Sequence, residues 1–145
     1  MARGAYDTSA WDDFYEEINR KLSVPALNKF ILETAGLINT SIKMRVQRKG
    51  IGSYGRMAGY SRMYSQYKGQ SGRQVAFRDL TYSGKMFQAL TETLIAPMTV
   101  KSFFIGAEAK KAEENDARTP FFSHTEAEDK VLNNEVDTYF AFWGK

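Results

Sequence analysis

The chain has 145 residues, of which 43% are apolar and 26% charged, and its net charge is +3. This length suits a single domain over residues 1–145. The absence of cysteine excludes a disulfide framework, a thiolate zinc site and a cysteine nucleophile, and the single histidine excludes a site that needs two imidazoles. The longest stretch without a charged residue, Thr34–Ile42, is far shorter than the about 20 residues that span a bilayer. The acidic N-terminal segment also lacks the basic start and apolar run of a signal peptide.

The charges are segregated along the chain. Residues 43–85 hold ten basic side chains and one acidic side chain, whereas residues 108–137 hold nine acidic and four basic ones. Residues 6–17 hold five acidic side chains and no basic one. This segregation favours an electrostatic partner, either nucleic acid or an oppositely charged protein face, over a solvated surface that happens to be patchy.

Apolar periodicity predicts two helices in the N-terminal third of the chain. The acidic segment 1–22 contains an amphipathic helix over residues 9–22, with Ser9 as its N-cap and an apolar side that begins at Trp11. A longer helix begins near Pro25, a residue tolerated in the first helical turn, and ends at Gly50. Gly36 within this helix favours a bend or a close contact with another helix.

The periodicity is lost between residues 49 and 79, which hold six of the eleven glycines and few aliphatic side chains. We interpret this segment as an extended basic loop, because it cannot bury enough apolar surface to order itself. Its length indicates a functional segment or one that a partner orders. A short helical turn around residues 61–67 would place four side chains on one side, namely Tyr60, Met63, Tyr64 and Tyr67.

Regular structure is expected again from Leu80 onwards. Ser83 caps a predicted helix. The inner face of this helix is formed by Met86, Phe87, Leu90 and Leu94. Two strands follow, over residues 94–98 and 100–106, with Pro97 at an edge or a bulge of the first strand.

The C-terminal part is expected to be helical. Residues 107–115 form a polar helical turn or loop, and the T-x-x-E sequence of Thr125–Glu128 is a capping box that starts the last helix, which continues through Trp143. The predicted fold class is therefore α+β. Long N-terminal helices and a C-terminal helix pack on a small antiparallel sheet, with a long loop rich in glycine, tyrosine and arginine.

No residue pattern points to catalysis. His124 and the acids Glu126, Glu128 and Asp129 are better explained as residues around a helix start than as a general base or a cation site. The spacing G-x-G-x-x-G at residues 50–55 follows a helix rather than a strand, so it does not predict a dinucleotide site. We therefore expect no enzymatic activity, no metal and no other cofactor.

The basic segment alternates cationic side chains with tyrosines. This combination can neutralise phosphates and stack bases, and it equally suits a protein interface. Composition does not separate the two. The candidate residues for a partner or DNA interface are Arg45, Arg48, Lys49, Arg56, Tyr60, Arg62, Tyr64, Tyr67, Lys68, Arg73 and Arg78.

Four motifs occur in a recognisable order between residues 55 and 140. They are YSRMYSQYKG at 60–69, DLTYSGKMFQAL at 79–90, SFFIG at the end of a strand over 99–106, and RTPFF at 118–122 before an acid-rich helix start at 125–129. In this order they resemble the virion-morphogenesis and tail-completion proteins of tailed bacteriophages, which are small components of the neck. The matching motif positions are Leu80, Ser83, Gly84, Met86, Leu90, Gly106, Arg118, Pro120, Phe121 and Phe122. Ser123 and His124 stand where the family commonly has glycine and leucine, and the N-terminal acidic helix has no counterpart.

The resemblance implies a structural, non-catalytic protein of the virion, assembled in the host cytoplasm. It would lie at the head–tail junction or the top of the tail and complete the tail for joining to the head. It implies a homo-oligomeric ring around the DNA passage, typically hexameric. The implied partners are other neck, connector and tail proteins, with contact to genomic DNA in the channel as a further option and no membrane. The alternative from the residues themselves is a nucleic-acid-binding module that uses segment 43–85.

Overall fold

The computed structural model describes residues 9–81 and 83–141. The fold is α+β, as the sequence predicts. Its elements in chain order are α1 (Ser9–Lys21), α2 (Val24–Lys49), β1 (Ile51–Gly52), β2 (Gly55–Arg56), α3 (Arg62–Gln70), α4 (Lys85–Gln88), β3 (Leu90–Ala96), β4 (Thr99–Phe104), α5 (Ala107–Arg118) and α6 (Glu126–Tyr139).

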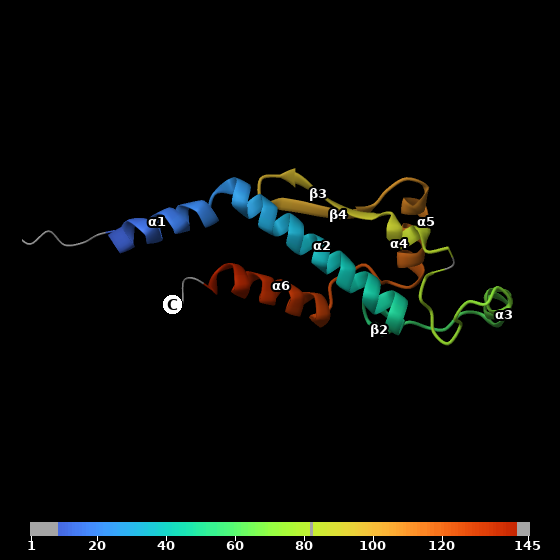
Figure 1. The fold of residues 1–145 in the computed structure, drawn as a ribbon. Helices are drawn as coiled ribbons and strands as arrows, with labels where there is room; N and C mark the ends of the chain where they lie inside the picture. The colour runs from blue at the N-terminus through green and yellow to red at the C-terminus, as the bar shows by residue number, and fades with distance from the viewer. Residues whose placement is uncertain (1–8, 82, 142–145) are drawn as a thin grey trace, which may run out of the picture.

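Helix α2 is the axis of the molecule (Figure 1). Helix α6 packs along one side of α2, and the antiparallel β3–β4 hairpin packs along another side. Helix α1 extends beyond the N-terminal end of α2, whereas α3 lies beyond its C-terminal end, at the opposite end of the molecule (Figure 1). The shape is therefore elongated, with α3 separated from the layers that surround α2.

Both ends of α2 are where the sequence predicts them. Ser23 is the N-cap and its hydroxyl accepts from the backbone N–H of Ala26, with Pro25 in the first turn. Gly50 ends the helix at φ 64°, and a Cβ there would lie 2.7 Å from a ring carbon of Phe77, so glycine is needed for both conformation and space. The predicted close contact of Gly36 is with the side chain of Glu92 in β3 rather than with a helix.

The core lies between α2, α4, α5 and the loop before α6. Ile38, Ile42 and Val46 bury one side of α2, and Phe121 is completely buried beside them. The ring centroids of Phe87 and Phe121 are 5.7 Å apart in an edge-to-face arrangement, which is favourable for aromatic pairs. This cluster fixes the positions of the elements that carry the candidate site.

The β3–β4 hairpin confirms the predicted irregularity near Pro97. Its register is shifted between Leu94 and Ala96, and Pro97 itself lies in the turn. The next residue, Met98, has φ 56°, and its backbone N–H donates to Oδ1 of Asn28 (2.7 Å). The turn is thereby attached to the first part of α2.

The predicted helix after Ser83 is wrong beyond its first turn. Helix α4 ends at Gln88, and Leu90 and Leu94 belong to β3, which begins four residues earlier than predicted. These residues form a strand because they pair with β4, where Leu90 lies opposite Phe104 and Leu94 opposite Val100. A spacing of four fits a helix as well as a strand, and only the partner strand distinguishes them. The N-cap of α4 is Gly84 at φ 78°, while Ser83 precedes it and accepts from the N–H of Lys85.

The segment 49–79 contains more regular structure than predicted. It includes the short β1–β2 hairpin and the nine-residue helix α3. Helix α3 covers the helical turn predicted around residues 61–67. Met57 joins the hydrophobic core, whereas Met63 and Tyr67 on α3 are 81% and 57% exposed. In place of aliphatic packing, this segment is held by polar contacts such as those of Tyr60 and Lys68 with Asp79.

The remaining helices differ from the predictions mainly in their ends. Helix α1 is confirmed, but Ser9 is its first residue rather than a flanking cap. The polar stretch after Gly106 forms the three-turn helix α5. The capping box of Thr125 and Glu128 is confirmed, whereas α6 ends at Tyr139, and Trp143 lies outside the described residues.

Candidate functional site

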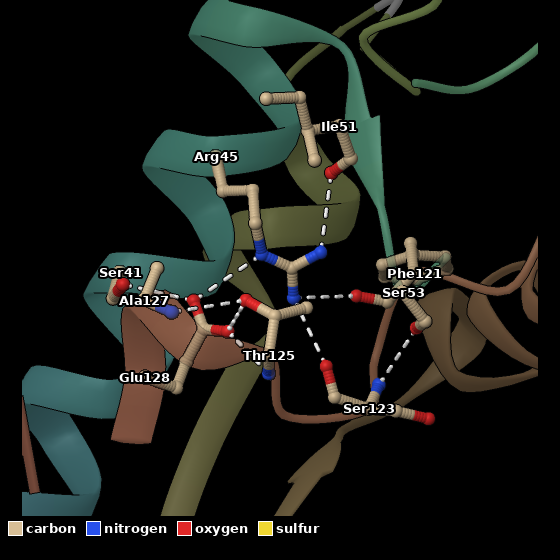
Figure 2. A network of polar contacts seen from close by, with 9 residues as sticks. All are labelled: Ser41, Arg45, Ile51, Ser53, Phe121, Ser123, Thr125, Ala127 and Glu128. Atoms are coloured by element: carbon tan, nitrogen blue, oxygen red, sulfur yellow. Dashed lines mark hydrogen bonds and ion pairs between the residues drawn. The ribbon is translucent and has the colours of Figure 1, made fainter. Parts of the chain in front are cut away.

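A buried ion pair joins α2 to α6 (Figure 2). Nε of Arg45 lies 3.2 Å from Oε1 of Glu128, and the two side chains are 6% and 0% exposed. Glu128 also accepts from the Ser41 hydroxyl (2.8 Å) and from the hydroxyl and backbone N–H of Thr125 (2.6 and 2.9 Å). The carboxylate is thus fully satisfied without water, as a buried charge requires.

The guanidinium of Arg45 also anchors two loops. It donates to the carbonyl oxygens of Ile51 in β1, and of Phe121 and Ser123 before α6 (Figure 2). The hydroxyl of Ser53 accepts from the N–H of Ser123 in the same place. Arg45 therefore holds the end of α2 and the start of α6 together and presents no charge to a partner.

A second buried ion pair lies at the base of α3. Nζ of Lys68, which is 1% exposed, lies 2.5 Å from Oδ1 of Asp79. The Tyr60 hydroxyl donates to the same carboxylate oxygen (2.6 Å), and the Lys68 ammonium lies 4.6 Å from the centre of the Tyr60 ring. We call residues 58–79 the arm. The triad of Tyr60, Lys68 and Asp79 holds the beginning and the end of the arm together.

The two buried carboxyl groups have lowered pKa values. Burial by itself raises the pKa of Asp79, but hydrogen bonds from Lys68 and Tyr60 outweigh it, so the pKa lies below the ordinary value of 3.8. Burial likewise raises the pKa of Glu128, but hydrogen bonds from Thr125 and Ser41 and the charge of Arg45 bring it below 4.5. Burial and the neighbouring Asp79 raise the pKa of Tyr60, so its hydroxyl stays protonated and can donate.

The structure divides the predicted interface residues by exposure. Two of them, Arg45 and Lys68, are buried in ion pairs, and we remove them from the candidate interface. Tyr60, Tyr64 and Arg78 are half-buried at the base of the arm. The residues with exposed side chains are Arg48, Lys49, Arg56, Arg62, Tyr67 and Arg73. The exposed set runs from the end of α2 through β2 into the arm.

A cavity of about 580 Å³ lies where the base of the arm meets α4 and α5. It brings together residues that are far apart in the sequence, which are Tyr60, Ser61, Tyr64, Arg78, Leu80, Ser83, Gly84, Met86, Lys111, Asn115 and Arg118. Three of these side chains are cationic, and no described lining residue is acidic. The chemistry of this cavity suits an anion.

The motif positions singled out in the sequence have two roles in the structure. Leu80, Ser83, Gly84, Met86 and Arg118 line the cavity. The others have structural roles. Gly106 is the N-cap of α5 at φ 64°, and Leu90 is the first residue of β3. Phe121 and Phe122, which follow Pro120, donate their backbone N–H groups to the Asp116 carboxylate.

Sequence reasoning missed the importance of Asp79, Glu128 and Lys111. The sequence could have pointed to an ion pair at Asp79, because it is the single acid among the ten basic residues of segment 43–85. The capping box identified the hydrogen bonds of Glu128 within α6 but not Arg45, which is 83 residues earlier. Lys111 had no signal, because its place in the cavity depends on how α5 packs.

Within residues 9–81 and 83–141 no cluster of histidine and acidic side chains could hold a metal ion. None of the helices described there is long and apolar enough to cross a membrane.

Comparisons with protein-family models, with curated proteins and with solved structures give no match to this chain.

Proposed function

We propose that this protein is a structural component of a tailed-phage neck, which forms a homo-oligomeric ring, most simply a hexamer, at the head–tail junction or the top of the tail. It completes the tail for joining to the head and needs no catalytic group. The proposal rests on the resemblance of the motifs between residues 55 and 140 and on the distribution of charge over an elongated molecule.

The observation that carries the proposal is the exposed basic surface at one end of the molecule. Arg56, Arg62 and Arg73 are exposed on β2 and the arm, and Tyr67 on α3 is 57% exposed. Helix α3 of the arm lies apart from the layers around α2 (Figure 1). Arginine and tyrosine are enriched in protein interfaces, because each offers a large contact area together with hydrogen bonds.

A matching surface lies on α6, along the body of the molecule. Glu126, Asp129 and Asp137 are exposed on one side of this helix, with Lys130 among them. In a head-to-tail ring, one face of each subunit meets a different face of its neighbour. The basic arm of one copy and the acidic side of α6 of the next provide two such faces.

The alternative is a nucleic-acid-binding module that uses segment 43–85. It is favoured by the same exposed arginines, which could neutralise phosphates. A channel protein that must release DNA quickly is poorly served by tight phosphate binding, so we place protein contacts first.

A charge-swap experiment tests the proposal. Reversing Arg56, Arg62 and Arg73 to Glu should abolish assembly in the absence of DNA, measured by sedimentation and by the mass relative to the 16.5 kDa chain. Exposed ion pairs contribute about 0–1 kcal/mol each, so single reversals should have little effect. Adding Glu126→Lys, Asp129→Lys and Asp137→Lys to the same chain should restore assembly, and salt should weaken the wild-type ring because it screens such pairs.

The matched control reverses Lys29, Lys101 and Lys110, which changes the net charge equally on other exposed surfaces and should leave assembly intact. A DNA filter-binding assay on the same proteins separates the alternative. If the arm variant assembles normally and loses affinity for DNA, the ring proposal is overturned in favour of the nucleic-acid module.

A further inference from the structure

The cavity at the base of the arm is built like a ligand site. Its volume of about 580 Å³ falls within the range of about 300–1,000 Å³ that is usual for small-molecule sites. Tyr60, Ser61 and Tyr64 form the side toward the arm, and Lys111, Asn115 and Arg118 form the side toward α5. A ligand bound here would touch both the arm and the body.

Arg78 lines the cavity and is held in a fixed orientation. Its two terminal nitrogens donate to the Thr119 hydroxyl (2.6 Å) and to the carbonyl oxygen of Gly59 (3.1 Å). Its Nε is buried and has no hydrogen-bond partner. Because that nitrogen is closed to solvent, a ligand in the cavity would bind the spare N–H groups of the two terminal nitrogens instead.

Two further cations converge on the same cavity. Arg118 is exposed at the end of α5, and Lys111 lies two turns earlier on the same helix. Lys111 is paired with Glu108 (2.8 Å), but the lysine is 54% exposed, and such a pair yields readily to a second anion. Three cations with no acid among the described lining residues form a site for a phosphate rather than for a neutral ligand.

The aromatic side chains indicate what the phosphate is attached to. Tyr60 and Tyr64 both line the cavity, with ring centroids 4.8 Å apart. The Tyr60 ring already contacts Lys68 and Arg78, so we assign the base to Tyr64. Proteins that bind single-stranded nucleic acid combine cationic groups for the phosphates with aromatic side chains on which the bases stack. Leu80, at φ 51°, also lines the cavity, and such strained residues cluster at ligand sites.

We propose that this cavity binds one nucleotide unit, with its phosphate against Arg78, Lys111 and Arg118 and its base against Tyr64. The unit is either a free nucleotide or one nucleotide of a DNA strand, since both present the same chemistry. An acidic peptide would satisfy the cations but would make no use of the Tyr64 ring. The inference goes beyond the ring proposal, because Arg56, Arg62 and Arg73, which are reversed in that test, do not line the cavity.

Binding of dAMP by the full chain, measured by isothermal titration calorimetry at low salt, tests the proposal. We expect saturable binding of dAMP, weaker binding of ribose 5-phosphate, which lacks the base, and a loss of about tenfold or more in Lys111→Gln and in Arg118→Gln. Lys110→Gln, one residue away on α5 but outside the cavity, is the matched control and should bind normally. Tyr64→Leu should reduce binding of dAMP to the level of ribose 5-phosphate.

Competition identifies the source of the nucleotide. Displacement of dAMP by a single-stranded oligonucleotide indicates a DNA strand, and binding of dAMP that the oligonucleotide does not displace indicates a free nucleotide. The proposal is overturned if dAMP shows no saturable binding, if the Lys111→Gln/Arg118→Gln variant binds as the wild type does, or if a glutamate-rich peptide binds where dAMP does not. Unchanged circular dichroism of each variant shows that lost binding is not lost folding.

Discussion

The carboxylates of Asp79 and Glu128 are buried, and each is paired with a buried cation. A buried ion pair is not by itself a large source of stability, because both charges lose their hydration. Removing one partner is a different matter, since it leaves an uncompensated charge inside the protein. These residues therefore fix how the segments meet more than they add to the free energy of unfolding.

Replacement of Glu128 by alanine should be strongly destabilising. The change leaves the Arg45 guanidinium buried without its counter-ion and the Ser41 hydroxyl without its acceptor. We expect a loss of about 3–5 kcal/mol in the free energy of unfolding, measured by urea denaturation.

Glu126→Ala is the matched control for this change. Glu126 lies on the same helix, its side chain is 84% exposed, and its pair with Lys130 is open to solvent, so the unfolding midpoint should hardly move. Equal effects of the two substitutions would show that the Arg45–Glu128 pair does not hold α2 and α6 together.

At the scale of elements, the arm is held in an unusual way. Its helix α3 buries mainly Lys68, and Met63 and Tyr67 on the same helix are exposed. The triad of Tyr60, Lys68 and Asp79 replaces the aliphatic packing that would normally hold a helix. A segment with little apolar burial opens at a lower free energy than the core does.

Limited digestion with trypsin should show this difference. In the wild type we expect the first cuts at Arg62 or Arg73 in the arm, and none at Lys68, because that side chain is buried. Asp79→Asn should raise the rate of cutting within the arm at least several-fold, with Lys68 now cleaved, because cleavage follows the population of the opened segment.

Asp137→Asn removes an exposed acid from α6 and serves as the matched control, with an unchanged pattern expected. If α2 is cut before the arm in the wild type, or if Asp79→Asn leaves the rates unchanged, the triad is not what keeps the arm closed.

At the scale of the whole molecule, the two buried carboxyl groups make unfolding depend on pH. The pKa of Asp79 and that of Glu128 lie below their ordinary values of 3.8 and 4.5, so the unfolded state binds more protons than the folded state when the pH is lowered into this range. Their contribution to stability is therefore complete above about pH 5 and is lost as the pH falls through the lowered pKa values.

Thermal denaturation between pH 6 and pH 2.5 should show a steep fall in Tm below pH 4.5. The Asp79→Asn/Glu128→Gln variant should have a lower Tm near neutral pH and a flatter dependence on pH, because the two titrating groups are gone. Parallel curves for the wild type and this variant would assign the acid sensitivity to other carboxyl groups.

The sequence by itself determined those parts of the structure that depend on near neighbours. Pro25 and Gly50 bound α2, Thr125 and Glu128 form the capping box, and Pro97 marks the irregular end of β3. Each is a matter of local backbone geometry or of hydrogen bonds within a few residues, so a short stretch of sequence is sufficient. The excess of basic residues in segment 43–85 likewise indicated a basic surface, and most of these side chains are exposed.

Only the tertiary structure decided which residues meet across long distances. Leu90 became part of a strand because Phe104 lies opposite it, and Arg45 and Lys68 are interior residues because Glu128 and Asp79 are placed beside them. The cavity needs Tyr64 and Lys111, from helices separated by the whole β3–β4 hairpin. A buried ion pair and a cavity are both formed by residues that are far apart in the chain. A local sequence pattern does not show which distant residues will meet.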